Sequence, residues 1–143
     1  MYLEINPQHI IQYAHFGYVY CMLIVGGLGG GEDEMLISGG GDGDVKTWRT
    51  DPSGSGITPL RTLEGSDSSV LSMAVNESFL YCGLSDGDIS IWDLETFQLI
   101  RSVREHRNDV LTVSVGGGDV LTGSATGYVR VSDILCWRQV RNC

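Results

Sequence analysis

The chain has 143 residues and a formal net charge of −9, with nine Lys and Arg against 18 Asp and Glu. Phosphate backbones and anionic membrane surfaces repel such an acidic chain, so we expect neither nucleic acid nor a membrane as a partner. Twenty glycines, three prolines and 42% hydrophobic residues suit a β-rich protein with many turns and an apolar core.

The N-terminal part predicts strands joined by a loop. We expect a leading strand at about residues 8–13, which would belong to a neighbouring structural unit. The apolar run 16–25 is preceded by no Lys or Arg and is too short to span a bilayer, so it is also predicted as a strand. The glycine cluster 26–31 lacks the Lys-Ser/Thr of a phosphate-binding loop, and three acidic residues follow it. A loop between two strands is therefore favoured over a phosphate cradle.

One pattern occurs three times further along the chain. It reads LISGGGDGDVKTW at 36–48, YCGLSDGDISIWD at 81–93 and LTGSATGYVRVSD at 121–133. The segments before the last two copies, 61–75 and 101–115, align without a gap at an offset of 40 residues. Repetition at a fixed period of this size indicates stacked supersecondary units, because one unit cannot bury its apolar face alone.

Each copy is predicted to be about four β-strands with no helix. Asp42-Gly43 and Asp86-Gly87 suit tight hairpins, because Asp and Gly tolerate positive φ. In the segment 89–92, Ile89 and Ile91 are expected on one face of the sheet and Ser90 and Trp92 on the other.

A repeat of about 40 to 45 residues with four strands and a Trp-Asp pair resembles the WD-repeat family of β-propellers. The resemblance implies an all-β fold of about three four-stranded blades, at about residues 15–63, 66–103 and 106–143. Propellers have roughly 4 to 8 blades, so three blades predict an incomplete ring and a fragment of a larger propeller. The slot of the last outer strand, 138–143, has lost the apolar alternation.

In that family, four side chains lock a blade by hydrogen bonds: a His, a Ser or Thr, the turn Asp and the Trp. By resemblance, the first copy fills all four slots, with His15, Ser38, Asp42 and Trp48.

The other two copies match this tetrad in part. The second copy keeps Asp86, Trp92 and Asp93, but has Ser66 in the His slot and Cys82 in the Ser slot. The third keeps His106, Thr122 and Asp133, but has Thr126 in the Asp slot and Ser132 in the Trp slot. The resemblance therefore implies a firm lock only in the first blade.

A closer resemblance covers about residues 8–133. Segments 14–23, 36–48 and 79–103 resemble the N-terminal WD-repeat region of the fungal Dug-type glutathione-degrading di- and tripeptidases. In that family a propeller precedes a zinc metallopeptidase domain, and an amidotransferase-like subunit acts with it in cytosolic glutathione breakdown. The resemblance implies such a subunit as a partner of this chain, and a catalytic domain that this chain lacks.

The chain shows no catalytic, cofactor or metal motif. His9, His15 and His106 form no metal-ligand spacing with carboxylates. Asp42-x-Asp44 resembles the start of a calcium loop, but Ser53 stands where the loop needs a bidentate Glu. We therefore expect no enzyme activity from this chain and no bound cofactor.

Cys21, Cys82, Cys136 and Cys143 show no paired spacing, and the first two lie in apolar runs. Reduced cysteines of this kind behave as small hydrophobes. This pattern predicts a reducing compartment and a cytoplasmic location.

Two functions remain open. The first is a non-catalytic protein-interaction module or scaffold, and the second is the accessory propeller of a glutathione-degrading peptidase. Arg101, Arg104 and Arg107 suit either an acidic partner or a solvated outer strand and loop. The open blade edges of an incomplete ring also predict self-association.

Overall fold

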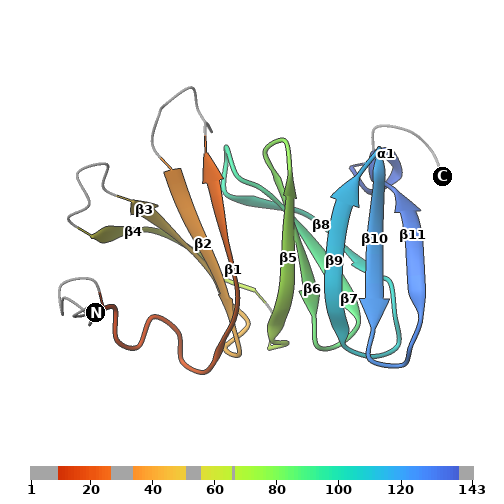
Figure 1. Ribbon diagram of the computed structural model, residues 1–143, viewed down its shortest axis with the longest axis horizontal. Helices are drawn as coiled ribbons and strands as arrows, with labels where there is room; N and C mark the ends of the chain where they lie inside the picture. The colour runs from red at the N-terminus through yellow and green to blue at the C-terminus, as the bar shows by residue number, and fades with distance from the viewer. Residues whose placement is uncertain (1–9, 27–33, 51–55, 66, 139–143) are drawn as a thin grey trace, which may run out of the picture.

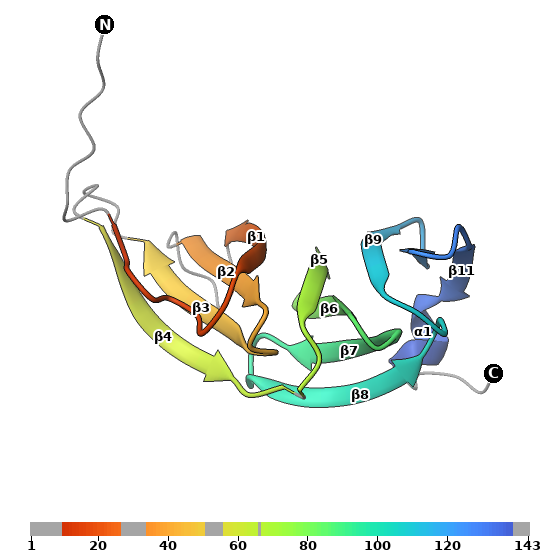
Figure 2. The same ribbon diagram turned by 90° about the horizontal axis from the view of Figure 1, so that it is seen from below.

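The protein is described by a computed structural model over residues 10–26, 34–50, 56–65 and 67–138. Within these residues, eleven strands form three antiparallel sheets that stand side by side (Figure 1). The view from below shows the sheets fanned along an arc, with the first strand of each sheet on the inner side (Figure 2). The described sheets form an open arc rather than a closed ring.

The first sheet, blade 1, contains four strands in sequence order. They are β1 (Val19–Gly26), β2 (Glu34–Gly40), β3 (Val45–Thr50) and β4 (Ile57–Leu63). Blade 2 has the same order with β5 (Val70–Asn76), β6 (Phe79–Leu84), β7 (Asp88–Asp93) and β8 (Gln98–Arg104). Blade 3 contains β9 (Val110–Gly116), β10 (Asp119–Ser124) and β11 (Val129–Asp133), followed by the one-turn helix α1 (Ile134–Trp137).

The core lies between the blades, and the middle blade buries both faces of its middle strands, β6 and β7. On β7, Trp92 packs into the cluster shared with blade 1, whereas Ile89 and Ile91 pack into the cluster shared with blade 3. The predicted alternation of this strand is confirmed. Tyr81 of β6 also faces blade 3, while Leu80 faces blade 1.

The predicted hairpin turns are confirmed in all three blades. Gly43, Gly87 and Gly127 have φ of 84°, 95° and 88°, a left-handed conformation that favours glycine. In the first two turns, the side chains of Asp42 and Asp86 accept hydrogen bonds from backbone N–H groups two residues later, at 3.1 and 2.9 Å.

Two expectations need correction. Residues 10–13, the described part of the expected leading strand 8–13, form coil and turn, since no described strand pairs with them. Helix α1 follows β11 where no helix was expected, because the carboxylate of Asp133 caps it by accepting from the N–H groups of Leu135 and Cys136. The slot of the last outer strand falls mostly on 139–143, outside the described residues.

Candidate functional site

In blade 1 the four predicted tetrad residues are joined by hydrogen bonds. His15 Nε2 lies 2.8 Å from Ser38 Oγ, and the Trp48 indole N–H donates to the same oxygen at 3.0 Å. His15 Nδ1 lies 3.0 Å from Asp42 Oδ1. The chain of contacts runs from the turn to the middle of the sheet, and His15, Ser38 and Trp48 are all buried.

The hydrogen bonds around Asp42 lower the pKa of its carboxyl group. Partial burial opposes ionisation of its carboxyl group, but hydrogen bonds from the backbone N–H groups of Asp44 and Phe16 and from His15 outweigh it and lower the pKa. Because this pKa is lowered on folding, the ionised carboxylate stabilises the fold at neutral pH, and that contribution is lost as the pH falls through the acid range.

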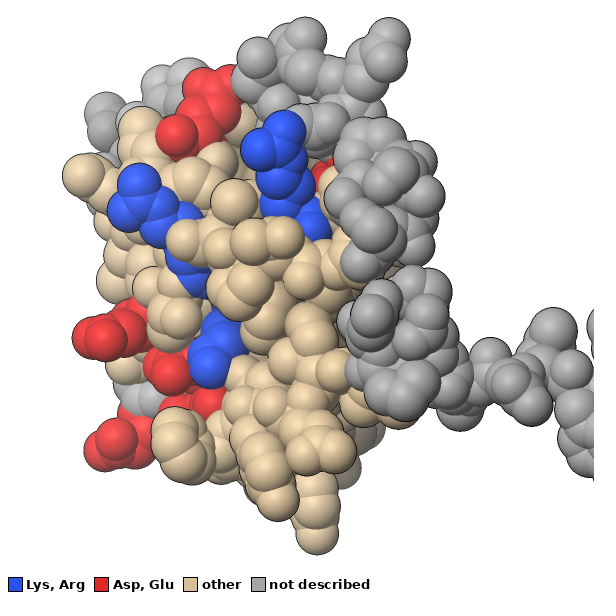
Figure 3. All heavy atoms as spheres, turned by 90° about the vertical axis from the view of Figure 1, so that its left-hand side faces the viewer, with Lys and Arg blue, Asp and Glu red and all other residues tan. Residues whose placement is uncertain are grey.

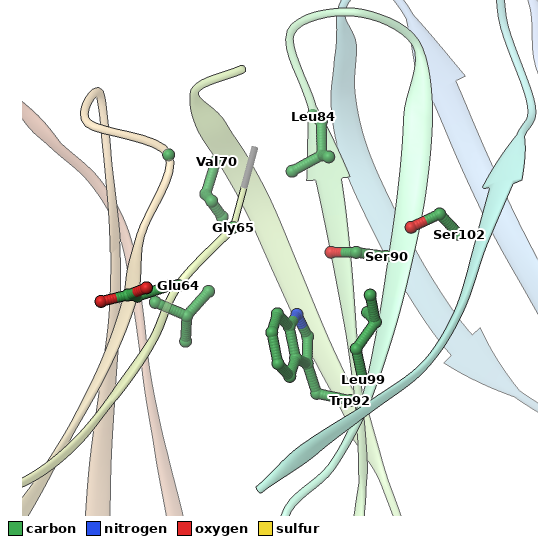
Figure 4. Close-up of a pocket in the computed structure, with 10 residues that line it drawn as sticks. Glu64, Gly65, Val70, Leu84, Ser90, Trp92, Leu99 and Ser102 are labelled. Atoms are coloured by element: carbon green, nitrogen blue, oxygen red, sulfur yellow. The ribbon is translucent and has the colours of Figure 1, made fainter. Parts of the chain in front are cut away.

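Blade 2 has a hollow beside its tryptophan. The hollow, of about 280 Å³, is lined by Trp92, Ser90 and Leu99 of blade 2 and by Val45 of blade 1, among other residues (Figure 4). Among the described residues, the Trp92 indole N–H has no acceptor. The thiol of Cys82, in the predicted Ser slot, is buried, and this burial raises its pKa.

Asp86 and Asp93 of blade 2 both bind local backbone. Asp86 accepts from Asp88 N, and Asp93 accepts from Glu95 N at 2.8 Å. Among the described residues, neither carboxylate forms a hydrogen bond with Trp92. The structure therefore does not join the predicted tetrad residues of the second copy.

Blade 3 keeps half of the tetrad and replaces the other half. His106 Nε2 lies 2.8 Å from Thr122 Oγ1, and both residues are buried. Ser132, in the Trp slot, donates to the carboxylate of Glu105 at 2.9 Å, and Arg130 lies 3.4 Å from the same oxygen. The sequence did not predict that Glu105 is buried, because a glutamate next to the tetrad residue His106 would be expected at the surface.

A groove opens between the β8–β9 connection and the β10–β11 turn. It has a volume of about 580 Å³ and is lined by Arg104, Glu105, His106, Arg107, Thr126, Tyr128 and Arg130. Arg104 forms an ion pair with Asp88 at 2.8 Å, and Arg130 is held by Glu105. Within the described part of the chain, Arg107 has no ion pair or hydrogen bond. Arg101 lies outside the groove and donates to the carbonyl of Cys136 at 3.2 Å.

Comparison with known proteins agrees with the repeat geometry. The family model "WD domain, G-beta repeat" matches residues 57–93, which span the end of blade 1 and most of blade 2. The computationally designed Ika4 protein superposes on 70% of this chain with a TM-score of 0.61 and 31% identity, over 60% of its own length.

The chain is similar to the WD-repeat family over residues 57–93. The prediction of an all-β WD-repeat propeller with about three blades is thereby confirmed.

WD-repeat relatives among curated proteins are much longer than this chain. The probable di- and tripeptidase DUG2 of Saccharomyces cerevisiae is 33% identical over 127 residues, which cover 79% of this chain and 14% of that protein. Regulatory-associated protein of TOR 1 of Arabidopsis thaliana is 26% identical over 72% of this chain and 9% of its own length. The similarity to DUG2 confirms the predicted resemblance to the Dug-type peptidases.

Arg138, just after α1, is a further residue that sequence reasoning missed. Its guanidinium donates to the hydroxyl of Tyr81 at 2.9 Å and lies 4.2 Å from the centre of the Phe79 ring. It also pairs with Glu77 at 3.2 Å. Arg138 therefore ties the end of blade 3 to blade 2, although its place in the sequence indicated only a degraded outer strand.

Three further properties of the described residues concern metal binding, membrane-spanning helices and the state of the cysteines. No group of three or more His, Cys, Asp or Glu among them is arranged to hold a metal ion, and none of their helices is long and apolar enough to cross a membrane. Cys21 and Cys82 carry free thiols, and burial raises the pKa of Cys21 to about 11. Cys136 is disulfide-bonded.

Proposed function

We propose that this chain is a non-catalytic protein-interaction module that binds an acidic segment of a partner through the groove at blade 3. WD repeats are typical of protein-interaction modules. The observation that carries the proposal is the unpaired guanidinium of Arg107 in a groove that holds two more arginines. Arginine and tyrosine are enriched in protein interfaces, and Tyr128 is largely exposed at the groove.

The charges in the groove favour an acidic occupant. The carboxylate of Glu105 is already engaged by Arg130 and Ser132, so it repels an incoming anion less than a free carboxylate would. Arg107 is left to bind a carboxylate, and a planar guanidinium does this with two parallel hydrogen bonds. The rest of the chain is strongly acidic, so the groove is a local positive site on a negative surface.

Replacing Arg107 with glutamine is expected to weaken binding of an acidic peptide about tenfold, because one charge-assisted contact is removed. The probe is a fluorescein-labelled peptide of Glu, Asp and Gly, and binding is followed by fluorescence anisotropy. Added salt should weaken the same interaction, since exposed charges are screened.

The matched control is Lys46→Gln, which removes one positive charge on β3 of blade 1, far from the groove in sequence. A peptide with Gln and Asn in place of Glu and Asp controls for non-ionic binding. Equal affinity of the Arg107 variant and the parent chain would show that the groove is not the binding site.

A second function is favoured by the similarity to DUG2. We propose that the chain acts as the accessory propeller of a glutathione-degrading zinc metallopeptidase, with a scaffolding role toward an amidotransferase-like subunit. The similarity to a protein named as a probable di- and tripeptidase, over 79% of this chain, supports this proposal. A cytoplasmic location belongs to the same proposal and stays a prediction.

This second function is tested by pull-down of the amidotransferase-like subunit with the tagged chain, beside an assay of glutathione and Cys-Gly hydrolysis. We expect capture of the subunit and no hydrolysis, because the described residues contain no metal-holding group. The Arg107→Gln variant serves as the control for docking through the groove. Hydrolysis by this chain alone would contradict the non-catalytic assignment, and failure to capture the subunit would leave only the general interaction module.

A further inference from the structure

The face of blade 3 that points away from blade 2 is apolar and exposed. Leu121 of β10 and Val129 and Val131 of β11 lie on this face, since Leu121 pairs with Val131 across the strands and Val129 is two residues from it. They are 39%, 73% and 61% exposed.

The repeat shows what normally covers such a face. At the offset of 40 residues, these three positions correspond to Tyr81, Ile89 and Ile91 of blade 2, which are all 0% exposed because blade 3 packs on them. Among the described residues, no blade packs on this end face of blade 3, although it has the side chains of a covered blade face.

The opposite end of the arc has the complementary face. Met22 of β1 is 57% exposed on the side of blade 1 that points away from blade 2. Alignment of Val19 with Val70 places Met22 in the slot of Met73, which is 8% exposed because it packs against blade 1. Tyr20 and Ile24 are exposed near Met22. The view onto this end shows uncharged atoms with several Lys and Arg side chains among them, and acidic side chains mainly at its left edge and at the top (Figure 3).

We infer that the two end faces bind each other between two copies of this chain, head to tail, so that blade 3 of each copy packs on blade 1 of the other. This contact repeats the pairing already seen twice within the chain, in which the far face of one blade packs on the near face of the next. Both internal contacts bury apolar side chains, which is the main force that holds such sheets together.

Blade number fixes how many copies close the ring. The described part of each copy has three blades, so two copies give six, which lies within the roughly 4 to 8 blades of known propellers. Three copies give nine, which lies outside that range. A head-to-tail contact forms a closed ring only when its rotation closes, and otherwise forms open filaments, so the two-copy ring is the expected product.

The experiment is sedimentation equilibrium of the full chain and of two variants, Met22→Asp and Leu121→Asp. We expect the parent chain to have the mass of two copies. Each variant should raise the dissociation constant of the dimer at least about tenfold, because it places a charge in an apolar contact. Ile100→Asp is the matched control, since Ile100 is 40% exposed but lies on the outer strand β8 of blade 2.

Mixing the two variants tests the head-to-tail geometry. One variant keeps an unaltered blade 3 face and the other an unaltered blade 1 face, so the mixture should recover association through one intact contact. Far-UV circular dichroism of each variant checks that its sheets are retained. A monomeric parent chain would overturn the inference, as would a dimer sensitive to only one of the two substitutions or a mixture that stays monomeric. None of these results depends on acidic peptide binding at the groove.

Discussion

Replacing Trp48 with alanine is expected to lower the free energy of unfolding by about 3 to 5 kcal/mol, because it removes a large buried ring. The substitution also removes the last member of the hydrogen-bond chain that runs from Asp42 through His15 and Ser38. Left without the indole N–H, the buried Ser38 hydroxyl loses one of its two partners. Thermal and urea unfolding measure the loss.

Trp92→Ala is the matched comparison. Trp92 is 7% exposed and Trp48 is 6% exposed, so the two substitutions remove similar buried areas. Only Trp48 has an acceptor for its indole N–H among the described residues, and Trp92 already borders a hollow. Trp48→Ala should therefore be the more damaging change. If both variants unfold alike, the hydrogen-bonded set in blade 1 contributes nothing beyond packing, and the proposed lock is wrong.

Periodicity and turn chemistry carried most of the fold prediction. The offset of 40 residues and the Asp-Gly turns depend on local backbone preference and on side-chain alternation, which the sequence expresses directly. The positive φ at Gly43 and Gly87 and the opposite faces of Ile91 and Trp92 follow from these two signals.

The features that were missed depend on contacts between distant segments. Glu105 is buried only because Ser132 and Arg130 fold back onto it from a strand about 25 residues later. Arg138 finds Tyr81 across 57 residues. No local pattern marks such partners, so the groove that Glu105 and Arg130 help to shape was visible in the sequence only as a loose basic group.

Gly87→Ala is expected to destabilise the protein by roughly 2 to 5 kcal/mol, from two additive causes. The first is backbone strain, since φ at Gly87 is 95° and a side chain there costs about 1 to 2 kcal/mol. The second is a steric clash, because a Cβ at this position would fall onto the backbone carbonyl of His106. Relief of that overlap requires a backbone shift, which costs about 1 to 3 kcal/mol.

Gly127→Ala separates these two causes. Gly127 occupies the equivalent turn of blade 3 with φ of 88°, but a Cβ there meets no atom within 4 Å. Gly127→Ala should therefore lose stability only through backbone strain, by about 1 to 2 kcal/mol. The difference between the two variants in urea unfolding then gives the free-energy cost of the clash.

The clash at Gly87 also has a consequence for binding. The carbonyl of Gly87 accepts hydrogen bonds from the N–H groups of Glu105 and His106, at 3.2 and 3.0 Å. Both residues line the groove at blade 3, so displacing this turn moves the groove wall. Gly87→Ala should accordingly weaken acidic peptide binding at temperatures where the chain is still folded. Equal losses of stability in the two variants would mean that the connection from β8 to β9 yields freely, and that the groove is not held rigid by the β6–β7 turn.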